Sequence, residues 1–334
     1  MFHQPARAIV DSVIEVSELT KRYGDTTAVR DLSFTVRPGH VTGFLGPNGA
    51  GKTTTLRLLL GLNTPSAGTA TIDGRPFAER PRGLRYVGAL LDAQDTHGGR
   101  TARAHLGALA ASNGIARARV GEVLAEVGLA EVAGRRIGGF SLGMKQRLGI
   151  AGALLGDLPV LVFDEPLNGL DPEGVQWLRA LLRRLAGEGR TVFVSSHQMS
   201  EMELCAEQLI VIGRGELIAA ESLAEFAARG TSRGVRVKAR DPERLACALR
   251  AEGGGVVRGE QRPGERGPGE RGPGEQRPGE EVLTVTGLDS ERIGELALRE
   301  GIVLGELTPL DASLEQAFME LTATSVDYLA GDSR

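Results

Sequence analysis

The sequence has little cysteine, no long apolar run and no sign of a secretory signal. Its two cysteines, Cys205 and Cys247, fit neither a disulfide framework nor the paired spacing of a zinc site. No apolar run approaches the ~18 to 20 residues that a membrane helix needs, and the opening segment reaches an acidic residue at Asp11 without an unbroken apolar stretch. We therefore expect a cytoplasmic protein, which could work at the inner face of the cell membrane only through a partner that crosses it.

Excess positive charge is also lacking. The chain has 39 basic and 43 acidic side chains, a net charge of -4, which leaves no bulk attraction for nucleic acid or anionic lipid, so no nucleic-acid partner is expected. Aromatic residues make up only 4%, but 41% hydrophobic and 25% charged residues are typical of a soluble globular protein. A length of 334 residues exceeds the ~250 to 300 at which single cores stop growing, which predicts two domains.

The first domain, residues 1–228, has the pattern of an α/β protein. Short strands are expected within 13–45, and a strand then passes through a glycine turn into a helix over 51–62. The segment 95–155 is expected to be a helical subdomain. Unbroken apolar runs at 160–163 and 191–194 follow, separated by a helix, and this order indicates a parallel sheet that is covered on both faces.

The second domain, residues 229–334, is expected to be a small α+β unit. Its strands and helices follow βαββαβ order, with the last strand placed at 302–304. The middle is interrupted at 261–280 by a Pro-Gly-Glu repeat that has no apolar side chain to bury and balanced charge. This repeat is predicted to be a solvated loop between two strands.

The segment from Gly46 to Thr53 matches the pattern G-x-x-x-x-G-K-[ST], and it lies between a predicted strand and a predicted helix. In this pattern backbone N–H groups turn inward around phosphate oxygens, and the helix N-terminus adds partial positive charge. Lys52 would contact the β and γ phosphates, and the Thr53 hydroxyl would bind Mg²⁺. The candidate phosphate-binding residues are Gly46, Pro47, Asn48, Gly49, Ala50, Gly51, Lys52, Thr53 and Thr54.

Polar side chains follow the next two apolar strands. Asp164 and Glu165 end the run 160–163 in the manner of a Walker B motif, at the sheet edge where α/β proteins bind ligands. Asp164 would hold Mg²⁺ through water, and Glu165 would act as the general base on the attacking water. His197 follows the run 191–194, where it could hydrogen-bond a γ-phosphate or that water.

These motifs, together with the segments 140–147 and 168–171, resemble the ATP-binding cassette family over about residues 14–220. The family signature Leu-Ser-Gly-Gly-Gln aligns with 140–144, where the serine and one glycine are kept as Ser141 and Gly143. Tyr23 matches the aromatic residue that stacks on adenine. The Q-loop glutamine, a Mg²⁺ contact, aligns with Asp92, and Gln94 is the alternative.

The resemblance implies an ATPase with ATP and Mg²⁺ as ligands, working as a head-to-tail dimer of two copies or of this chain and a paralogous subunit. Ser141 and Gly143 would then meet ATP that is bound to the partner's phosphate loop. It further implies a separately encoded membrane permease. The C-terminal segment 313–322 is similar to the tail of members that export drugs or antibiotics, which predicts a drug, antibiotic or lipid-like cargo.

Three rival classes share parts of this set. A soluble ATPase of the same family acting on nucleic acid or ribosomes would have the same nucleotide residues, but such proteins usually have two cassettes or a long coiled coil. A P-loop kinase or GTPase leaves the signature, the Asp-Glu pair and the histidine unexplained. A non-catalytic module that closes on ATP without hydrolysis is favoured by the altered signature and Q-loop, but opposed by Lys52, Asp164, Glu165 and His197.

Overall fold

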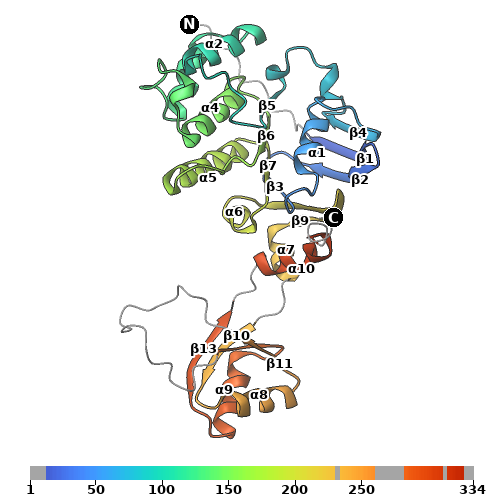
Figure 1. Ribbon diagram of the computed structural model, residues 1–334, viewed down its shortest axis with the longest axis vertical. Coiled ribbons are helices and arrows are strands. Elements are labelled where there is room, and N and C mark those ends of the chain that lie inside the picture. The colour runs from blue at the N-terminus through green and yellow to red at the C-terminus, as the bar shows by residue number, and fades with distance from the viewer. Residues whose placement is uncertain (1–12, 230–233, 260–281, 311–313, 327–334) are drawn as a thin grey trace, which may run out of the picture. The chain divides into compact units, whose positions relative to one another are not determined.

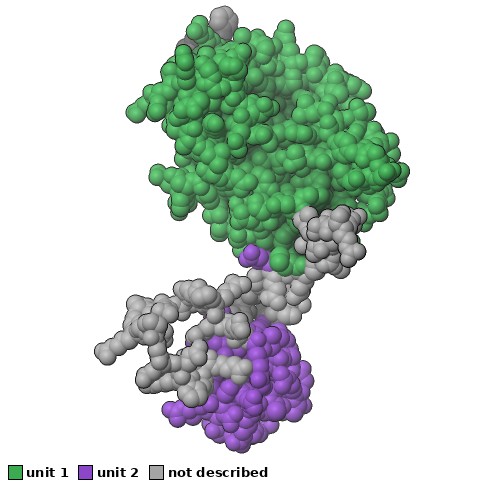
Figure 2. All heavy atoms as spheres, in the orientation of Figure 1, with its two compact units in different colours: residues 1–226, 318–334 green, residues 227–317 purple. Residues whose placement is uncertain are grey.

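The computed structural model describes residues 13–229, 234–259, 282–310 and 314–326. Contacts divide the chain into unit 1, Met1–Phe226 with Phe318–Arg334, and unit 2, Ala227–Ala317 (Figures 1 and 2). The sequence placed everything after residue 228 in the second domain, whereas this division returns Phe318 onward to unit 1. Phe318 is 5% exposed, and the helix pattern alone does not identify which core such a residue joins. The Pro-Gly-Glu repeat lies outside the described residues.

Unit 1 is built on a six-stranded sheet, and the order of its strands is β5-β6-β7-β3-β8-β9. The strands are β3 (Val41–Leu45), β5 (Val87–Leu90), β6 (Val160–Asp164), β7 (Thr191–Ser196), β8 (Gln208–Gly213) and β9 (Glu216–Ser222). Only β9 runs antiparallel to its neighbour. All residues of β3, β6 and β7 are buried, as expected for unbroken apolar strands covered on both faces.

Two layers cover this sheet. A three-stranded antiparallel sheet contains β1 (Ile14–Tyr23), β2 (Thr26–Val36) and β4 (Ala67–Ile72), and α1 (Lys52–Leu59) contacts β2, β4 and β6. Helix α5 (Pro172–Gly187) contacts β3 and β7, and Figure 1 shows it on the other side of the central strands. The helices α6 (Met199–Glu203) and α7 (Leu223–Arg229) follow β7 and β9, and α10 (Leu314–Val326) ends the described chain.

The expected helical subdomain contains α2 (Ala102–Asn113), α3 (Ala118–Glu126), α4 (Leu142–Leu154) and a 3₁₀ turn at Ile137–Gly139. Two further 3₁₀ turns, Phe77–Glu79 and Gly83–Arg85, precede it in the chain. Thr101 and Ser141 cap α2 and α4 with side-chain hydrogen bonds. None of the helices in the described part of the chain has the length and apolar content to cross a membrane.

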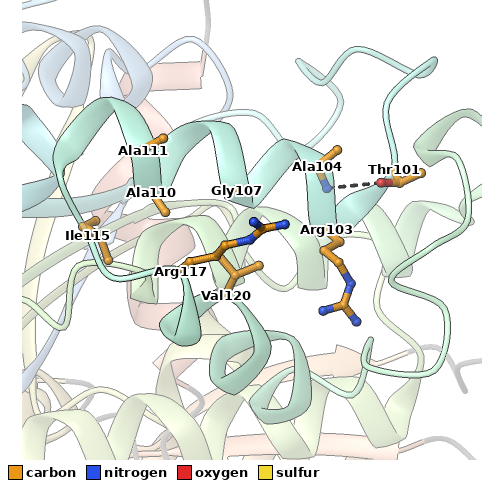
Figure 3. Close-up of a pocket in the computed structure, with 9 residues that line it drawn as sticks. All are labelled: Thr101, Arg103, Ala104, Gly107, Ala110, Ala111, Ile115, Arg117 and Val120. Carbon is orange, nitrogen blue, oxygen red and sulfur yellow. Dashed lines mark hydrogen bonds between the residues drawn. The ribbon is translucent and has the colours of Figure 1, made fainter.

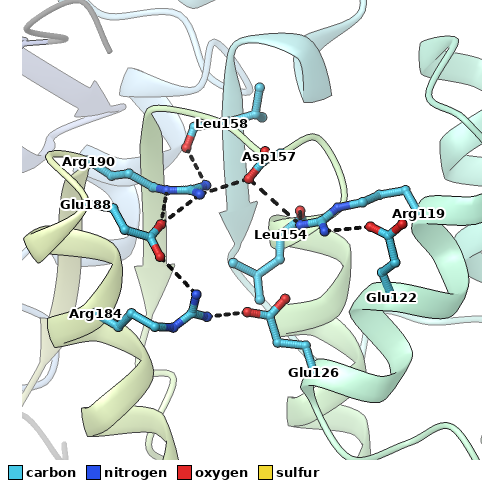
Figure 4. A network of polar contacts seen from close by, with 9 residues as sticks. All are labelled: Arg119, Glu122, Glu126, Leu154, Asp157, Leu158, Arg184, Glu188 and Arg190. Atoms are coloured by element: carbon cyan, nitrogen blue, oxygen red, sulfur yellow. Dashed lines mark hydrogen bonds and ion pairs between the residues drawn. The ribbon is translucent and has the colours of Figure 1, made fainter. Parts of the chain in front are cut away.

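A network of polar contacts joins α3 to α5 and to the connection between α4 and β6 (Figure 4). Arg190 lies 2.8 Å from Asp157 and 2.9 Å from Glu188, and Arg184 lies 2.9 Å from Glu188 and also pairs with Glu126 of α3. Because most of these groups are partly exposed, each pair contributes only ~0.2 to 1 kcal/mol, and the network acts mainly by orienting its helices.

Unit 2 has the predicted βαββαβ order. Its elements are β10 (Gly234–Ala239), α8 (Pro242–Ala251), β11 (Gly255–Gly259), β12 (Val282–Thr286), α9 (Ser290–Arg299) and β13 (Leu304–Leu310). The sheet is antiparallel, in the order β11-β12-β10-β13, and one face packs Val237 and Leu283 against α8 and α9. This confirms the small α+β unit.

The last strand was predicted wrongly at 302–304, because the structure begins it at Leu304. Ile302 instead lies in the turn that caps the C-terminus of α9, where its N–H donates to Ala297 O at 2.8 Å just after Gly301 at φ 65°. This bond satisfies one of the free carbonyls that end a helix.

Candidate functional site

The predicted phosphate loop connects β3 to α1 and is shaped by glycine. Gly49 and Gly51 have φ values of 82° and 102°, which few other residues adopt at low energy. A Cβ on Gly51 would lie 2.6 Å from Ala28 O, and a Cβ on Gly46 would lie 2.6 Å from Ile212 O. The loop therefore has no room for side chains at these two points, and Lys52 Nζ lies inside it, donating to Gly46 O at 2.7 Å.

Asp164 lies beside this loop because β6, β7 and β3 are consecutive in the sheet. Thr53 Oγ1 donates to Asp164 Oδ2 at 2.7 Å. On the other side, Ser195 of β7 is the register partner of Asp164 in β6, and its Oγ donates to Asp164 Oδ1. Burial raises the pKa of the Asp164 carboxyl, and the two hydroxyl bonds oppose that rise. The carboxylate is thus held from both sides and is 7% exposed.

Glu165 directs its carboxylate toward two other predicted site residues. One oxygen lies 3.5 Å from Lys52 Nζ, and the other lies 2.9 Å from His197 Nδ1. Burial lowers the pKa of Lys52, and the charge of Glu165 partly offsets this effect. Lys52, Glu165 and His197 therefore form one connected polar chain, in which a carboxylate next to an imidazole has the arrangement of a general base and its partner.

Thr53 and Asp164 together fit a hydrated Mg²⁺. Among the described residues there is no group of three or more His, Cys, Asp or Glu side chains that could enclose a metal ion. Mg²⁺ does not need such a group, because it keeps several waters and takes few protein oxygens together with substrate phosphates. A hydroxyl and a buried carboxylate oxygen at hydrogen-bond distance beside the phosphate loop supply that donor set.

The signature residues lie at the start of α4. Ser141 Oγ accepts a hydrogen bond from Met144 N at 3.2 Å and caps the helix. A Cβ on Gly143 would lie 3.0 Å from Gly169 O, so the signature packs closely on the segment 168–171. Ser141 is exposed, and its location leaves it open to a partner.

The remaining predicted contacts are exposed, with Tyr23 at the end of β1 and the Q-loop candidates after β5. Tyr23 is 49% exposed; its hydroxyl accepts from Asn63 Nδ2 at 2.9 Å, and Lys21 Nζ lies 4.8 Å from its ring centroid. Asp92 and Gln94 are both exposed after β5, and Asp92 Oδ1 accepts from Gln94 N at 2.7 Å. This turn does not distinguish between the two, so the Q-loop assignment remains a prediction.

Three polar residues of the site were not predicted. Ser195 Oγ accepts from Glu165 N at 2.9 Å, in addition to its contact with Asp164. Gln146 Nε2 donates to Glu165 O at 3.3 Å. Gln198 Nε2 lies 3.3 Å from His197 Nε2. Ser195 could have been found from its place at the end of a strand predicted to lie beside Asp164, whereas Gln146 lies in the signature segment 140–147 but nothing in the sequence indicates its contact with Glu165.

A strand, a glycine loop and a helix that hold Lys52 beside a carboxylate pair define a P-loop nucleotide-binding protein. The family model described as "ABC transporter" matches residues 29–168. An ABC transporter ATP-binding protein of Bacillus subtilis, YhcH, is 40% identical over 62% of this chain and 69% of its own length. The chain belongs to the ABC transporter family and is an ATP-binding, ATP-hydrolysing subunit, which confirms the prediction.

Further relatives and solved structures agree with this membership. The bacitracin transport ATP-binding protein BcrA of Bacillus licheniformis is 42% identical over 63% of this chain and 69% of its own length. The Nod factor export ATP-binding protein I of Burkholderia orbicola is 41% identical over 62% of this chain and 69% of its own length. A solved structure of an ATP-binding subunit of an ABC transporter matches with a TM-score of 0.60 at 26% identity. This match covers 65% of the present chain and 92% of the chain in the solved structure. Residues 233–315 match a domain of unknown function, DUF8746.

Proposed function

We propose that this subunit couples hydrolysis of Mg-ATP to export of a drug, antibiotic or lipid-like cargo through a separate membrane permease. The observation that carries the proposal is the single cluster formed by Lys52, Asp164, Glu165 and His197 beside the phosphate loop. Relatives named for bacitracin transport and Nod factor export support the direction and the class of cargo.

In the proposed reaction the chain's own side chains bind and orient the reactants. Lys52 leaves its contact with Gly46 O to bind phosphate oxygens, and Glu165 accepts a proton from the attacking water while His197 orients the γ-phosphate. Thr53 and Asp164 would hold Mg²⁺, which supplies charge neutralisation on the phosphates. Tyr23 would stack on adenine, and Asp92 or Gln94 would complete the site.

The working form in this proposal is a head-to-tail dimer, either of two copies or of this chain and a paralogous subunit. The exposed cap Ser141 and the adjacent Gly143 support it, because a hydroxyl and a backbone N–H at a helix start suit a phosphate. They would complete the partner's nucleotide site, so an isolated monomer would hydrolyse ATP poorly.

A groove of about 560 Å³ between α2 and α3 is our candidate for the permease contact. Figure 3 shows Arg103 and Arg117 extending from these helices beside an apolar lining that includes Ala104, Gly107 and Val120. Apolar surface with two cations suits a short amphipathic segment that bears an acidic residue. Placement of the subunit at the inner face of the cell membrane would follow from this contact.

The first experiment measures phosphate release by Glu165→Gln. Loss of the general base should lower steady turnover about hundredfold or more, while ATP binding persists. Glu203→Gln, which changes an exposed carboxylate on α6, should keep normal turnover. Unchanged turnover of Glu165→Gln would instead favour a different base, and a wild-type protein without turnover would favour a non-catalytic module.

The second experiment tests the partner. Glu165→Gln, held with Mg-ATP, is captured from detergent-solubilised membranes, and we expect a multi-span membrane protein in stoichiometric amount. Gly107→Leu should abolish this recovery, since a Cβ there meets no atom within 4 Å and the side chain would fill the groove. Gly121→Leu on α3, equally open but outside the groove lining, should not. Recovery of ribosomal or DNA-bound proteins would favour the soluble ATPase.

A further inference from the structure

Glu165 has an unusual main-chain conformation. Its φ of 48° lies in the left-handed region, which costs a non-glycine residue of order 1 kcal/mol or more and persists only where surrounding contacts hold it. Its N–H donates to Ser195 Oγ at 2.9 Å. Its carbonyl accepts from Asn168 N and from Gln146 Nε2, each at 3.3 Å. Strand β7, helix α4 and the turn that follows Glu165 therefore hold this one residue.

Of these three contacts, the one from Gln146 comes from a buried polar side chain at a position where packing alone would favour an apolar residue. The other buried side chains of α4 are apolar, such as Leu148 and Ile150, whereas Gln146 is polar and only 5% exposed. A buried amide costs free energy unless it is hydrogen-bonded, and a leucine or methionine would fill the space without that cost. The amide therefore has a use at this position that an apolar residue would not supply.

We propose that Gln146 is a positioning residue that fixes the backbone of Glu165 from the signature helix. The inference rests on the proposed role of Glu165 as general base. Gln146 touches no reacting atom; it holds the carbonyl of Glu165, so that the carboxylate stays within reach of His197 at 2.9 Å and Lys52 at 3.5 Å. The bond also links the position of the base to helix α4, whose N-cap is Ser141.

The two bonds to the Glu165 carbonyl are long, so neither alone is expected to hold the residue fully. Removing one should let the peptide relax for part of the time, and the base would then be misplaced in that fraction of molecules. Nucleotide contacts of the phosphate loop would be unaffected. The consequence is a loss in kcat with little change in KM for ATP.

The test compares Gln146→Met, which is similar in size but cannot donate, with Gln176→Met at an exposed position on α5. We expect kcat to fall about five- to tenfold in the first variant and to stay unchanged in the second, in keeping with the net worth of one neutral hydrogen bond. KM should stay within about twofold, and the unfolding temperature within about 3 °C.

A double-mutant cycle separates positioning from a general structural effect. If Gln146 acts through Glu165, Gln146→Met should have no further effect on single-turnover hydrolysis in the Glu165→Gln background. An equal fall in both backgrounds, or an unchanged kcat, would overturn the inference. Gln146→Asn, whose amide is too short to reach, serves in the same cycle if the methionine variant does not fold.

The same data separate this inference from the proposed function. A wild-type protein without hydrolysis, or a Glu165→Gln variant with normal turnover, would contradict the proposed base itself. Normal wild-type turnover that Glu165→Gln abolishes and Gln146→Met leaves intact would contradict only the role of Gln146.

Discussion

Replacing Ser195 by alanine removes one oxygen that serves two groups of the nucleotide site. Ser195 is 1% exposed; its hydroxyl donates to Asp164 and accepts from Glu165 N at 2.9 Å. In the variant Asp164 keeps only the Thr53 bond at 2.7 Å, and the N–H of Glu165 loses its acceptor. The change leaves the carbon skeleton and the sheet intact, so its effect reports on these two bonds.

The expected cost is large for so small a change. An unsatisfied buried donor costs about 1 to 3 kcal/mol, and a hydrogen bond to a charged acceptor contributes about 1.5 to 3 kcal/mol. Water can replace part of the lost hydrogen bonding, because the Glu165 side chain is 21% exposed. We therefore expect a loss of about 2 to 4 kcal/mol in the free energy of unfolding, or roughly 5 to 15 °C in unfolding temperature.

The loss should depend on pH. Burial raises the pKa of Asp164 above its unfolded value, so the folded state binds more protons and unfolding stability falls as pH rises through the carboxyl range. The hydrogen bond from Ser195 opposes that rise, so Ser195→Ala should raise the pKa of Asp164 in the folded state further. The destabilisation by Ser195→Ala should therefore grow as pH rises from about 4 to about 8.

Thermal unfolding across this pH range, followed by phosphate release, measures both effects. Ser112→Ala is the matched control, since its exposed hydroxyl also has two partners, donating to Leu109 O at 3.0 Å and accepting from Asn113 Nδ2 at 3.1 Å, both within its own helix. A Ser195→Ala loss below about 1 kcal/mol, or one no larger than that of Ser112→Ala, would refute the reasoning. A loss that is constant with pH would refute the part assigned to Asp164.

Three further predictions concern other parts of the chain. Gly51→Ala should abolish ATP binding in calorimetry and destabilise the protein by more than about 2 kcal/mol, because its Cβ would lie 2.6 Å from Ala28 O at a φ of 102°. Burial raises the pKa of Cys205 to about 11, so iodoacetamide should label only the exposed Cys247 until urea is added. The folded state keeps the Cys205 proton, and stability should therefore fall as pH rises from about 9 to about 11. Arg190→Ala should lower unfolding stability by about 0.4 to 2 kcal/mol, less at high salt, through its contacts with Asp157 and Glu188.

The phosphate loop and the carboxylate pair could be predicted because their patterns are local. Gly51 and Lys52 belong to one loop, and Asp164 and Glu165 end one apolar strand, so the short-range sequence determines their geometry. Ser195 and Gln146 could not be predicted in the same way. Their roles depend on the pairing of Asp164 with Ser195 across β6 and β7 and on the return of α4 to Glu165, and serine and glutamine are common residues.

In unit 2 the order of elements followed from alternating apolar residues, but the last strand did not. Ile302 and Leu304 are both apolar, and nothing in the pattern separates the residue that caps the C-terminus of α9 from the one that begins β13. Similarly, Ala317 and Phe318 are buried apolar residues of α10, but a helical pattern does not identify which core such residues join.

Unit 1 is discontinuous in sequence, since the chain leaves it at Phe226 and returns at Phe318. Domains generally fold as they emerge from the ribosome, beginning with the N-terminal one. Here the segment from Phe318 onward is synthesised after the whole of unit 2. The contacts between this segment and the rest of unit 1 can therefore form only after unit 2 has been synthesised. During translation the surface that receives Phe318 stays uncovered, and a chain that stops within unit 2 would keep it so.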